Sequence, residues 1–263
     1  MSHLRATIRL IALCAVTCGM YLFLIAGLAF TFPSRHARVI WRGFIFRKWA
    51  KATAAFLKIR IAAYGAPARA PFFLVSNHLS YVDIVVLASQ FRCSFIAKKD
   101  VSRWPVIGLL CRSIGTIFIN REDRRDIARV NGQVERALAE GRGVVLFAEG
   151  TSSEGATVLP FKRGLLEPAA RAGFAVSYAT LSYRVPDDET PAHLSVCWWG
   201  EMTFIKHLFG LLRLREINAT LIFGLDAIWD GDRKALASKL HAAVKQEFIP
   251  VVRSEREWIT TIR

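Results

Sequence analysis

The longest uncharged segment of the chain runs from Leu10 to Phe32, LIALCAVTCGMYLFLIAGLAFTF. A helix of this length crosses a hydrocarbon core of about 30 Å. The main alternative is a cleaved signal peptide, which has a shorter apolar region of roughly 7–15 residues and a small-residue cleavage site. No clear site of that kind precedes a polar start here. We therefore predict a retained transmembrane anchor over residues 1–32.

Positive charge is distributed unevenly around this segment. Only Arg5 and Arg9 precede it, whereas six basic residues follow it closely: Arg35, Arg38, Arg42, Arg47, Lys48 and Lys51. Basic residues concentrate on the cytoplasmic side of membrane helices. This bias predicts a single-pass protein of the cell inner membrane, with a short N-terminus outside and the bulk of the chain in the cytoplasm.

Residues 33–64 read as a basic amphipathic helix. Apolar side chains recur there at helical spacing, at Trp41, Phe44, Ile45, Trp49, Ala52 and Phe56, with basic residues beside them. One interpretation is an interfacial helix lying on lipid headgroups. The other is an ordinary helix packed on the core with a solvated basic face. The neighbouring anchor favours the interfacial helix.

The whole chain carries 36 Lys and Arg against 21 Asp and Glu, a net charge of +15. Such a surplus attracts nucleic acid, an anionic membrane or phosphorylated substrates. No groove-reading motif or RNA-binding aromatic signature is present, so we expect no nucleic acid partner. The five cysteines are scattered and lack CxxC spacing, which predicts neither a disulfide framework nor a metal site.

From residue 65 onward, short apolar runs alternate with charged helical stretches. The predicted strands are Phe72–Val75, Ser94–Ala97, Thr116–Ile119, Val144–Ala148, Ala175–Tyr183, Leu194–Trp199 and Ala219–Phe223. The predicted helices are Asp83–Ser89, Glu122–Glu140, Arg163–Ala172 and Asp232–Phe248. This alternation predicts one α/β domain over residues 65–263, with a mixed, largely parallel sheet flanked by helices.

The segment SNHLSYVD places Asn77, His78 and Asp83 where the first of these strands ends. The edge of a sheet where parallel strands end is the usual place for an active site. His78 is a candidate general base, with Asp83 orienting its ring. On a regular helix a spacing of five residues separates the two side chains, so the pairing requires a loop or a kink. The alternative is a helix N-terminus with Asn77 or Ser80 as its cap.

The segment VVLFAEGTSSEG ends a second strand in a polar turn containing Glu149, Gly150, Thr151 and Ser152. A serine hydrolase elbow requires GxSxG, and a Walker loop requires GxxxxGK[ST]; neither pattern is present. The turn is either an anion-binding site built from backbone N–H groups or a simple connection.

Basic residues follow two further strands. Lys98 and Lys99 come after Ser94–Ala97, and Arg121 comes after Thr116–Ile119. If these strands are parallel neighbours, the side chains converge on one crevice; otherwise they are solvated charges. Lys162 and Arg163, just before a predicted helix, are further candidate contacts for an anion. The alternative is that they form an ordinary basic start of that helix.

Together, these segments resemble the glycerolipid acyltransferase family, which includes the 1-acyl-glycerol-3-phosphate acyltransferases. The family's NHxxxxD, GxxFIxR and FPEGTRS blocks correspond to Asn77–Asp83, Gly115–Arg121 and Phe147–Ser153. A weaker fourth block corresponds to Ala175–Leu181. The order, spacing and strand context of the first three blocks agree over about residues 70–185.

The resemblance implies a membrane-bound O-acyltransferase with a glycerol-3-phosphate acyltransferase-like fold. His78, oriented by Asp83, would deprotonate the hydroxyl of a lysolipid, which attacks an acyl thioester. Asn77, Lys98, Arg121 and the turn from Glu149 to Ser152 would bind substrate. The co-substrate would be acyl-CoA or acyl-acyl carrier protein, without a further cofactor. An anionic membrane would be a partner.

Two positions depart from the third block of the family. Ala148 replaces a proline, and Ser152 replaces the arginine that contacts phosphate in many phosphatidate-forming members. We expect 1-acyl-sn-glycerol-3-phosphate as the acceptor, with a lyso-ornithine lipid or another lysophospholipid as the alternative. A membrane-tethered module that binds acidic lipids without catalysis, or a thioesterase or lipase, would be a different class of function.

Overall fold

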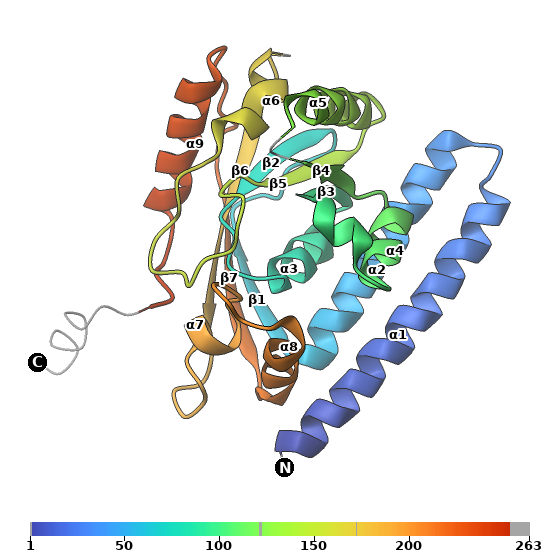
Figure 1. Ribbon diagram of the computed structural model, residues 1–263, viewed down its shortest axis with the longest axis vertical. Coiled ribbons are helices and arrows are strands. Elements are labelled where there is room, and N and C mark those ends of the chain that lie inside the picture. Colours follow the sequence, from blue (N-terminus) through green and yellow to red (C-terminus); the bar gives the residue numbers. More distant parts are fainter. Residues whose placement is uncertain (1, 121–122, 172, 253–263) are drawn as a thin grey trace, which may run out of the picture.

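The computed structural model describes residues 2–120, 123–171 and 173–252. At its centre is a seven-stranded sheet with the order β1-β7-β6-β2-β5-β3-β4 (Figure 1). The strands are β1 (Ile59–Tyr64), β2 (Phe72–Ser76), β3 (Cys93–Lys98), β4 (Ile117–Ile119), β5 (Gly143–Phe147), β6 (Val176–Arg184) and β7 (Ile217–Phe223). All neighbouring strands are parallel except the antiparallel pair β6 and β7. The predicted mixed, largely parallel α/β sheet is confirmed.

Helices cover both faces of this sheet and enclose two apolar cores (Figure 1). One core lies under α2 (Arg35–Leu57) and α3 (Val82–Gln90), and the other under α5 (Arg124–Ala139), α6 (Glu167–Arg171) and α9 (Arg233–Gln246). Strand β2 contributes Leu74 to the first core and Phe73 to the second. Because β2 is buried on both faces, its sequence is a continuous apolar run without alternation.

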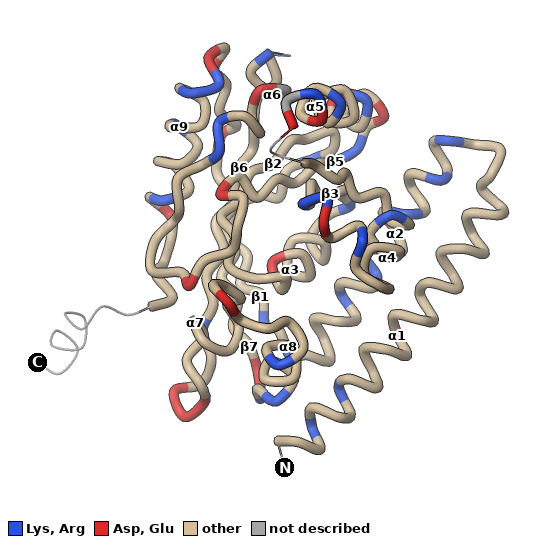
Figure 2. The backbone as a smooth tube through the Cα atoms, viewed as in Figure 1, with Lys and Arg blue, Asp and Glu red and all other residues tan. Residues whose placement is uncertain are grey.

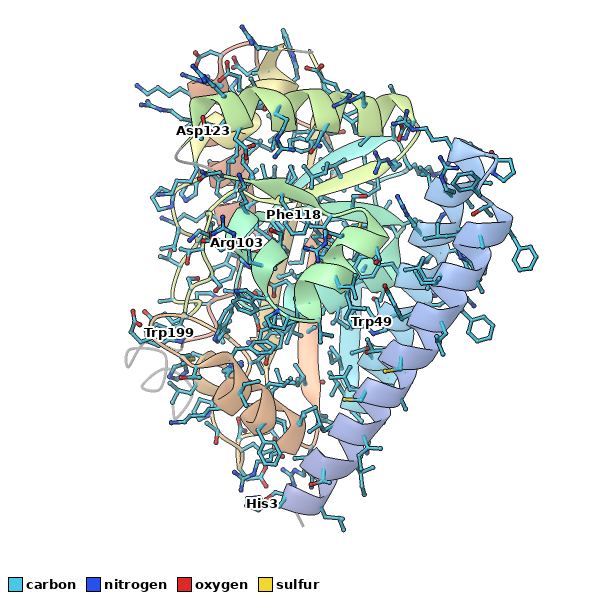
Figure 3. The ribbon with its side chains drawn as sticks, turned by 45° about the vertical axis from the view of Figure 1, so that its right-hand side comes forward. His3, Trp49, Arg103, Phe118, Asp123 and Trp199 are labelled. Carbon is cyan, nitrogen blue, oxygen red and sulfur yellow. The ribbon has the colours of Figure 1, made fainter. Side chains whose placement is uncertain are left out.

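Helix α1 (Ser2–Phe30) lies alongside the domain and packs on α2 and on α8 (Phe204–Arg213) (Figure 1). The indole Nε1 of Trp49, labelled in Figure 3, donates to Thr17 Oγ1 at 3.0 Å. The ring of Trp41 lies so close to Gly27 that a Cβ at Gly27 would stand 2.0 Å from it. By length and composition, α1 is the one helix in the described part of the chain that could cross a membrane.

The segment 33–64 differs from its predicted form. Much of the apolar face of α2, including Ile45, Phe46 and Leu57, is buried in the domain core, and Trp41 and Trp49 contact α1. The interpretation as an ordinary packed helix therefore describes this face. The segment also contains β1, which pairs with β7 in the register Ile59↔Ile217. Its sequence IRIAAY was not predicted as a strand, because most of this edge strand is exposed and its apolar signal is weak.

The predicted strand Leu194–Trp199 is wrong. Its first part forms the short helix α7 (Ala192–Ser195), and the remainder is irregular. The backbone N–H of Trp198 donates to the loop residue Leu79 at 2.8 Å, so the apolar run is buried without entering the sheet. The other elements are η1 (Lys99–Arg103), η2 (Arg163–Leu166) and α4 (Ile107–Ile114). The sequence analysis missed α4 and α8, which are short.

Candidate active site

His78 and Asp83 lie in contact at the carboxyl-terminal end of β2. The Nδ1 atom of His78 is 2.7 Å from Asp83 Oδ2. Residues 77–80 form a loop and helix α3 begins only at Val82, so the five-residue spacing brings the two side chains together instead of separating them. Asp83 Oδ2 also accepts hydrogen bonds from the backbone N–H groups of Leu79 and Ser80, at 2.7 and 3.0 Å. The carboxylate therefore holds both the loop and the imidazole.

Asp83 is fully buried, and its second oxygen is bonded to Tyr183 of β6. The phenol donates to Asp83 Oδ1 at 2.7 Å. Burial, followed by the nearby Asp83 charge, raises the pKa of Tyr183 well above its usual value, so the phenol keeps its proton. Four hydrogen-bond partners around one carboxylate fix Asp83 in position.

Tyr183 was missed as a site residue by the sequence analysis, although the apolar run around it was predicted as a strand. It shares a strand face with Ala179 and Leu181, both of which lie in the core. A buried tyrosine hydroxyl usually has a hydrogen-bond partner. A tyrosine at a core-facing position of a strand therefore indicated a buried hydrogen bond. The sequence did not indicate that Asp83 is the acceptor of this bond.

Glu149, at the end of β5, is buried and binds the loop that carries His78. Its Oε1 accepts from the His78 backbone N–H at 2.7 Å, and its Oε2 accepts from Leu159 N–H at 3.0 Å. Burial raises the pKa of Glu149 to about 8, although the two backbone hydrogen bonds oppose this shift. Both oxygens are occupied by backbone donors. Glu149 thus positions the His78 loop, and its predicted contact with substrate stays a prediction.

Asn77 is also buried, and both of its amide atoms are bonded to the backbone of β6. Its Nδ2 donates to Leu181 O at 2.9 Å, and its Oδ1 accepts from Leu181 N at 2.7 Å. The backbone pairing between β2 and β6 ends at Ser76↔Ala179. Beyond this pair, the two bonds between the Asn77 side chain and the Leu181 backbone continue to hold β2 to β6. In the structure Asn77 bonds to backbone, and its predicted contact with substrate stays a prediction.

The turn from Glu149 to Ser153 lies against the His78 loop. The backbone N–H of Ser153 donates to His78 O at 3.1 Å. Gly150 has a φ of +81°, which favours glycine at this position. Thr151 is exposed, and the Ser152 hydroxyl donates to Trp198 O. Gly150, Thr151 and Ser152 are thus brought close to the site, with Ser152 turned toward a backbone carbonyl.

The imidazole of His78 stacks on Phe147, with ring centroids 4.0 Å apart and an interplanar angle of 13°. Stacking fixes the ring plane, and the bond to Asp83 fixes its rotation. Because Nδ1 is occupied by Asp83, Nε2 is the nitrogen left for a substrate. The His78 side chain is 21% exposed, so a reactant has access to the ring.

The two basic candidates have different outcomes. Lys98 ends β3, and its ammonium pairs with Asp100 at 2.7 Å while the side chain remains 64% exposed. A pair this exposed contributes little binding energy, so Lys98 remains available to an anion. Arg121 lies outside the described residues, and its predicted role stays a prediction.

An aromatic cluster lies next to the His78 loop, formed by Tyr81, Trp104, Trp198 and Phe204. The ring centroids of Tyr81 and Phe204 are 5.2 Å apart, and those of Trp104 and Phe204 are 5.8 Å apart. The Tyr81 hydroxyl is 2.9 Å from Nδ1 of buried His207, whose Nε2 is 2.9 Å from Cys197 O. Burial lowers the pKa of His207, which favours a neutral ring whose Nδ1 accepts a hydrogen bond from the Tyr81 hydroxyl. The cluster forms a rigid apolar surface beside the site.

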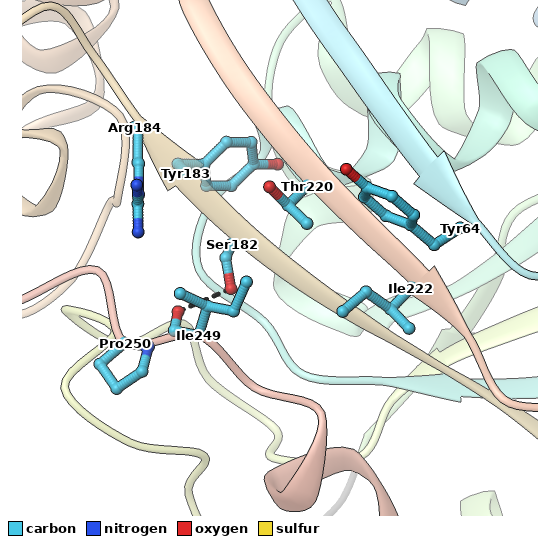
Figure 4. A pocket seen from close by; sticks show the side chains of 8 residues that line it. All are labelled: Tyr64, Ser182, Tyr183, Arg184, Thr220, Ile222, Ile249 and Pro250. Atoms are coloured by element: carbon cyan, nitrogen blue, oxygen red, sulfur yellow. Dashed lines mark hydrogen bonds between the residues drawn. The ribbon is translucent and has the colours of Figure 1, made fainter.

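A separate pocket of about 400 Å³ lies at the far strands of the sheet (Figure 4). Its lining residues are Tyr64, Ser182, Tyr183, Arg184, Thr220, Ile222, Ile249 and Pro250. The hydroxyl of Ser182 donates to Ile249 O at 2.7 Å and ties its floor to the segment after α9. The site residues predicted from the sequence do not line this pocket, but Tyr183, which bonds to Asp83, does.

A histidine bonded through Nδ1 to a buried carboxylate can accept a proton at Nε2, because the carboxylate stabilises the resulting imidazolium. His78 has this arrangement at an accessible ring. The described geometry therefore supports general base catalysis on a hydroxyl or a water molecule.

Comparisons with known proteins identify the family. The family model Acyltransferase matches residues 60–183. A lyso-ornithine lipid O-acyltransferase of Rhizobium meliloti (strain 1021) is 32% identical over 218 residues, covering 78% of this chain and 73% of that protein. A 1-acyl-sn-glycerol-3-phosphate acyltransferase of Neisseria gonorrhoeae is 33% identical over 172 residues, covering 65% of this chain and 67% of that protein.

Among solved structures, the 1-acyl-sn-glycerophosphate (LPA) acyltransferase PlsC from Thermotoga maritima has the same fold, with a TM-score of 0.66. The match covers 94% of this chain and 95% of that chain at 18% sequence identity. The fold, the histidine and aspartate pair at the end of β2 and the relatives above 30% identity all agree. The chain therefore belongs to the acyltransferase family.

Proposed function

We propose that this protein transfers a fatty acyl group from an acyl thioester to the free hydroxyl of a lysolipid. The observation that carries the proposal is the 2.7 Å contact between His78 Nδ1 and buried Asp83, which leaves Nε2 for the substrate hydroxyl. The hydroxyl oxygen attacks the thioester carbonyl carbon, so that an ester C–O bond forms and the C–S bond breaks. His78 takes the hydroxyl proton and returns it to the departing thiolate.

His78 and Asp83 are the proposed catalytic pair, and three buried residues position them. Tyr183 bonds to the Asp83 carboxylate, Glu149 bonds to the His78 backbone, and Asn77 ties the end of β2 to β6. Lys98, Arg121 and the turn of Gly150, Thr151 and Ser152 are the proposed contacts for phosphate groups of the acceptor or the donor. The donor is acyl-CoA or acyl-acyl carrier protein, and no further cofactor takes part.

The proposed acceptor is 1-acyl-sn-glycerol-3-phosphate, which gives phosphatidic acid for phospholipid biosynthesis. A lyso-ornithine lipid is the second candidate, because Ser152 has no guanidinium and its hydroxyl is turned to Trp198 O. Relatives above 30% identity carry both names. A compact phosphate and a zwitterionic headgroup are bound by different hydrogen-bond donors of the protein. A single acceptor site therefore favours one of these two lipids over the other.

We further propose that α1 holds the protein in an anionic inner membrane, with the catalytic domain on the cytoplasmic side. Its outward face carries a stripe of exposed apolar residues that includes Leu4, Ile8, Ile11 and Leu22. The Arg9 guanidinium donates to Arg215 O at 3.0 Å, which holds the N-terminal end of α1 to the domain. This contact keeps the N-terminal end of α1 beside the domain, and the single-pass crossing predicted from the sequence stays a prediction.

The function is tested with membranes that contain the full chain, a labelled acyl thioester and a panel of lysolipids. Transfer of label to a lysolipid, and its loss in His78→Ala, is the expected result. Release of free fatty acid without esterification would instead indicate a thioesterase. Lipid binding without turnover of any thioester would indicate a non-catalytic module. Protease protection of a tag at either end of the chain tests the membrane topology.

A further inference from the structure

Arg42, on α2, is a half-buried cation without a counter-ion in the described part of the chain. Its Nε atom is buried and has no hydrogen-bond partner, and the described residues provide neither an acceptor nor an ion pair for its guanidinium. Burial, followed by the charges of Arg38 and Arg142, lowers the pKa of Arg42. Partly buried charges are normally paired, because an unpaired one loses hydration without compensation.

The neighbours of Arg42 make the shortage of negative charge larger. Arg142 precedes β5, and its own Nε is also buried and unpartnered. Arg92 packs its aliphatic stem on Gly43, where a Cβ would stand 3.1 Å from Arg92 Cβ. The acid that pairs with this group is Glu140, which is shared between Arg35 at 2.6 Å and Arg142 at 3.0 Å. Among the described residues, Glu140 is thus the one carboxylate paired with these five arginines, which favours binding of a further anion. Figure 2 shows Lys and Arg positions in blue along α2, near its turn with α1.

This arginine cluster, defined as Arg35, Arg38, Arg42, Arg92 and Arg142, lies far from His78. Arg142 adjoins the first residue pair between β2 and β5, Phe72↔Gly143, whereas His78 follows the last pair, Ser76↔Phe147. At about 3.3 Å per residue, the two ends of these strands are separated by roughly 13 Å before the flanking residues are counted. An anion bound at the cluster is therefore not a reactant at the imidazole.

The surroundings of the cluster identify the source of the anion. Phe30 and Phe32, at the turn between α1 and α2, are 87% and 74% exposed. The Arg38 guanidinium lies 5.7 Å from the Phe32 ring centroid and donates to Phe32 O. Exposed phenylalanine rings next to arginines match the boundary between acyl chains and headgroups. A phosphate in free solution would not require the rings.

We propose that the arginine cluster binds the phosphate group of an anionic phospholipid, at a site separate from the catalytic centre. The phosphodiester accepts hydrogen bonds from Arg42 and Arg142, and the acyl chains of that lipid lie along Phe30 and Phe32. This inference rests on the proposed membrane association and adds to it a headgroup site with a fixed place in the fold. The site orients the turn between α1 and α2 on the membrane.

The experiment uses the purified full chain in an uncharged detergent. Thermal unfolding is followed during titration with phosphatidylglycerol, phosphatidylcholine or inorganic phosphate, because a ligand of the folded state raises the midpoint. The wild type should gain more from phosphatidylglycerol than from either other probe. Arg42→Gln and Arg142→Gln should each weaken this gain, with about a tenfold loss of apparent affinity. Lys245→Gln, on α9 at the opposite side of the domain, makes the same charge change and should keep the gain.

Three outcomes would overturn the proposal. Equal gains from phosphatidylglycerol and phosphatidylcholine would remove the charge requirement. Equal losses in Arg42→Gln and Lys245→Gln would mean a diffuse response to net charge. An equal gain from inorganic phosphate would make the ligand a free anion. Where Arg42→Gln lowers the midpoint without lipid, Arg38→Gln replaces it. Lipid binding requires no acyl transfer, so failure of the proposed reaction leaves this test intact.

Discussion

At the carboxyl-terminal ends of β2 and β5, the acidic side chains of Asp83 and Glu149 are paired within the chain, whereas at the opposite ends Arg42 has no acceptor among the described residues. Asp83 accepts from four donors and Glu149 accepts from two. The arginine cluster has a single shared carboxylate in Glu140. A region whose hydrogen bonds are complete is preorganised to do chemistry, and a region with unpaired donors is suited to receive a ligand.

The largest expected effect is on acyl transfer, and it should leave the membrane-binding region unaffected. His78→Ala should reduce acyl transfer by about 100- to 10,000-fold, because it removes the general base. Attachment to vesicles should not change, since the arginine cluster and α1 are untouched. Initial rates and vesicle sedimentation on the same preparation measure both. Turnover close to that of the wild type would contradict the assigned base.

A smaller effect tests whether the Asp83 network acts as a unit. Tyr183→Phe keeps the ring but removes the donor to Asp83 Oδ1, so kcat should fall by about tenfold while KM for the thioester changes little. Asp83→Asn alone should be more severe. If Tyr183 acts through Asp83, the double variant Asp83→Asn with Tyr183→Phe should be no slower than Asp83→Asn alone.

Additive losses in that cycle would assign Tyr183 to packing alone. Ser182→Ala, on the neighbouring β6 position that faces the pocket, is the matched control. It removes a hydroxyl bonded to Ile249 O, outside the Asp83 network. Its rate should stay close to that of the wild type.

Titration of Glu149 should make the free energy of unfolding depend on pH. Burial raises the pKa of Glu149 in the folded state to about 8 from its ordinary value of 4.5. The contribution to stability is therefore full below about pH 4.5 and is lost as pH rises toward 8, by at most about 1.4 kcal/mol per pH unit. Glu149→Gln should flatten this part of the profile, because an amide does not ionise.

Urea unfolding at several pH values measures the slope of the Glu149→Gln profile. The absolute stability of the variant should be lower at acidic pH, since an amide offers one acceptor where two backbone N–H groups now bond. A slope identical to that of the wild type would show that Glu149 is already ionised at neutral pH.

The smallest expected effect concerns the acceptor headgroup. Ser152→Arg adds a forked donor beside the site, and a charged hydrogen bond of about 1.5–3 kcal/mol favours a compact phosphate. Because Ser152 is turned to Trp198 O, the gain for lysophosphatidate over lyso-ornithine lipid should be a few-fold. Parallel initial rates with both lipids give the ratio. An unchanged ratio with activity preserved would place residue 152 away from the headgroup.

Much of the domain could be predicted from the sequence because its strands are apolar runs buried on both faces. Strand β1 escaped prediction because only Ile59 among its residues is buried. The run around Cys197 was mistaken for a strand, since burial alone does not distinguish a sheet from a buried loop. The hydrophobic pattern of a segment indicates how deeply it is buried. It does not indicate which other segment packs against it.

The site was predictable where chemistry and spacing coincide in one segment, as at His78 and Asp83. Bonds between distant segments were not predictable. Tyr183 is 100 residues from Asp83, and Asn77 is 104 residues from Leu181. For the same reason, the sequence assigned Asn77 and Glu149 to substrate, whereas their partners are backbone groups of other segments.

The bond between Arg9 and the backbone of Arg215 has a consequence for biosynthesis. The two residues are 206 positions apart, so α1 leaves the ribosome long before its acceptor exists. Strand β1 likewise cannot pair in the sheet until β7, its neighbour, has been synthesised. During translation, the Arg9 guanidinium of α1 therefore has no access to this acceptor until Arg215 has been made, and α1 reaches its final place only after that. Helix α1 is thus synthesised well before its contacts with the domain can be completed.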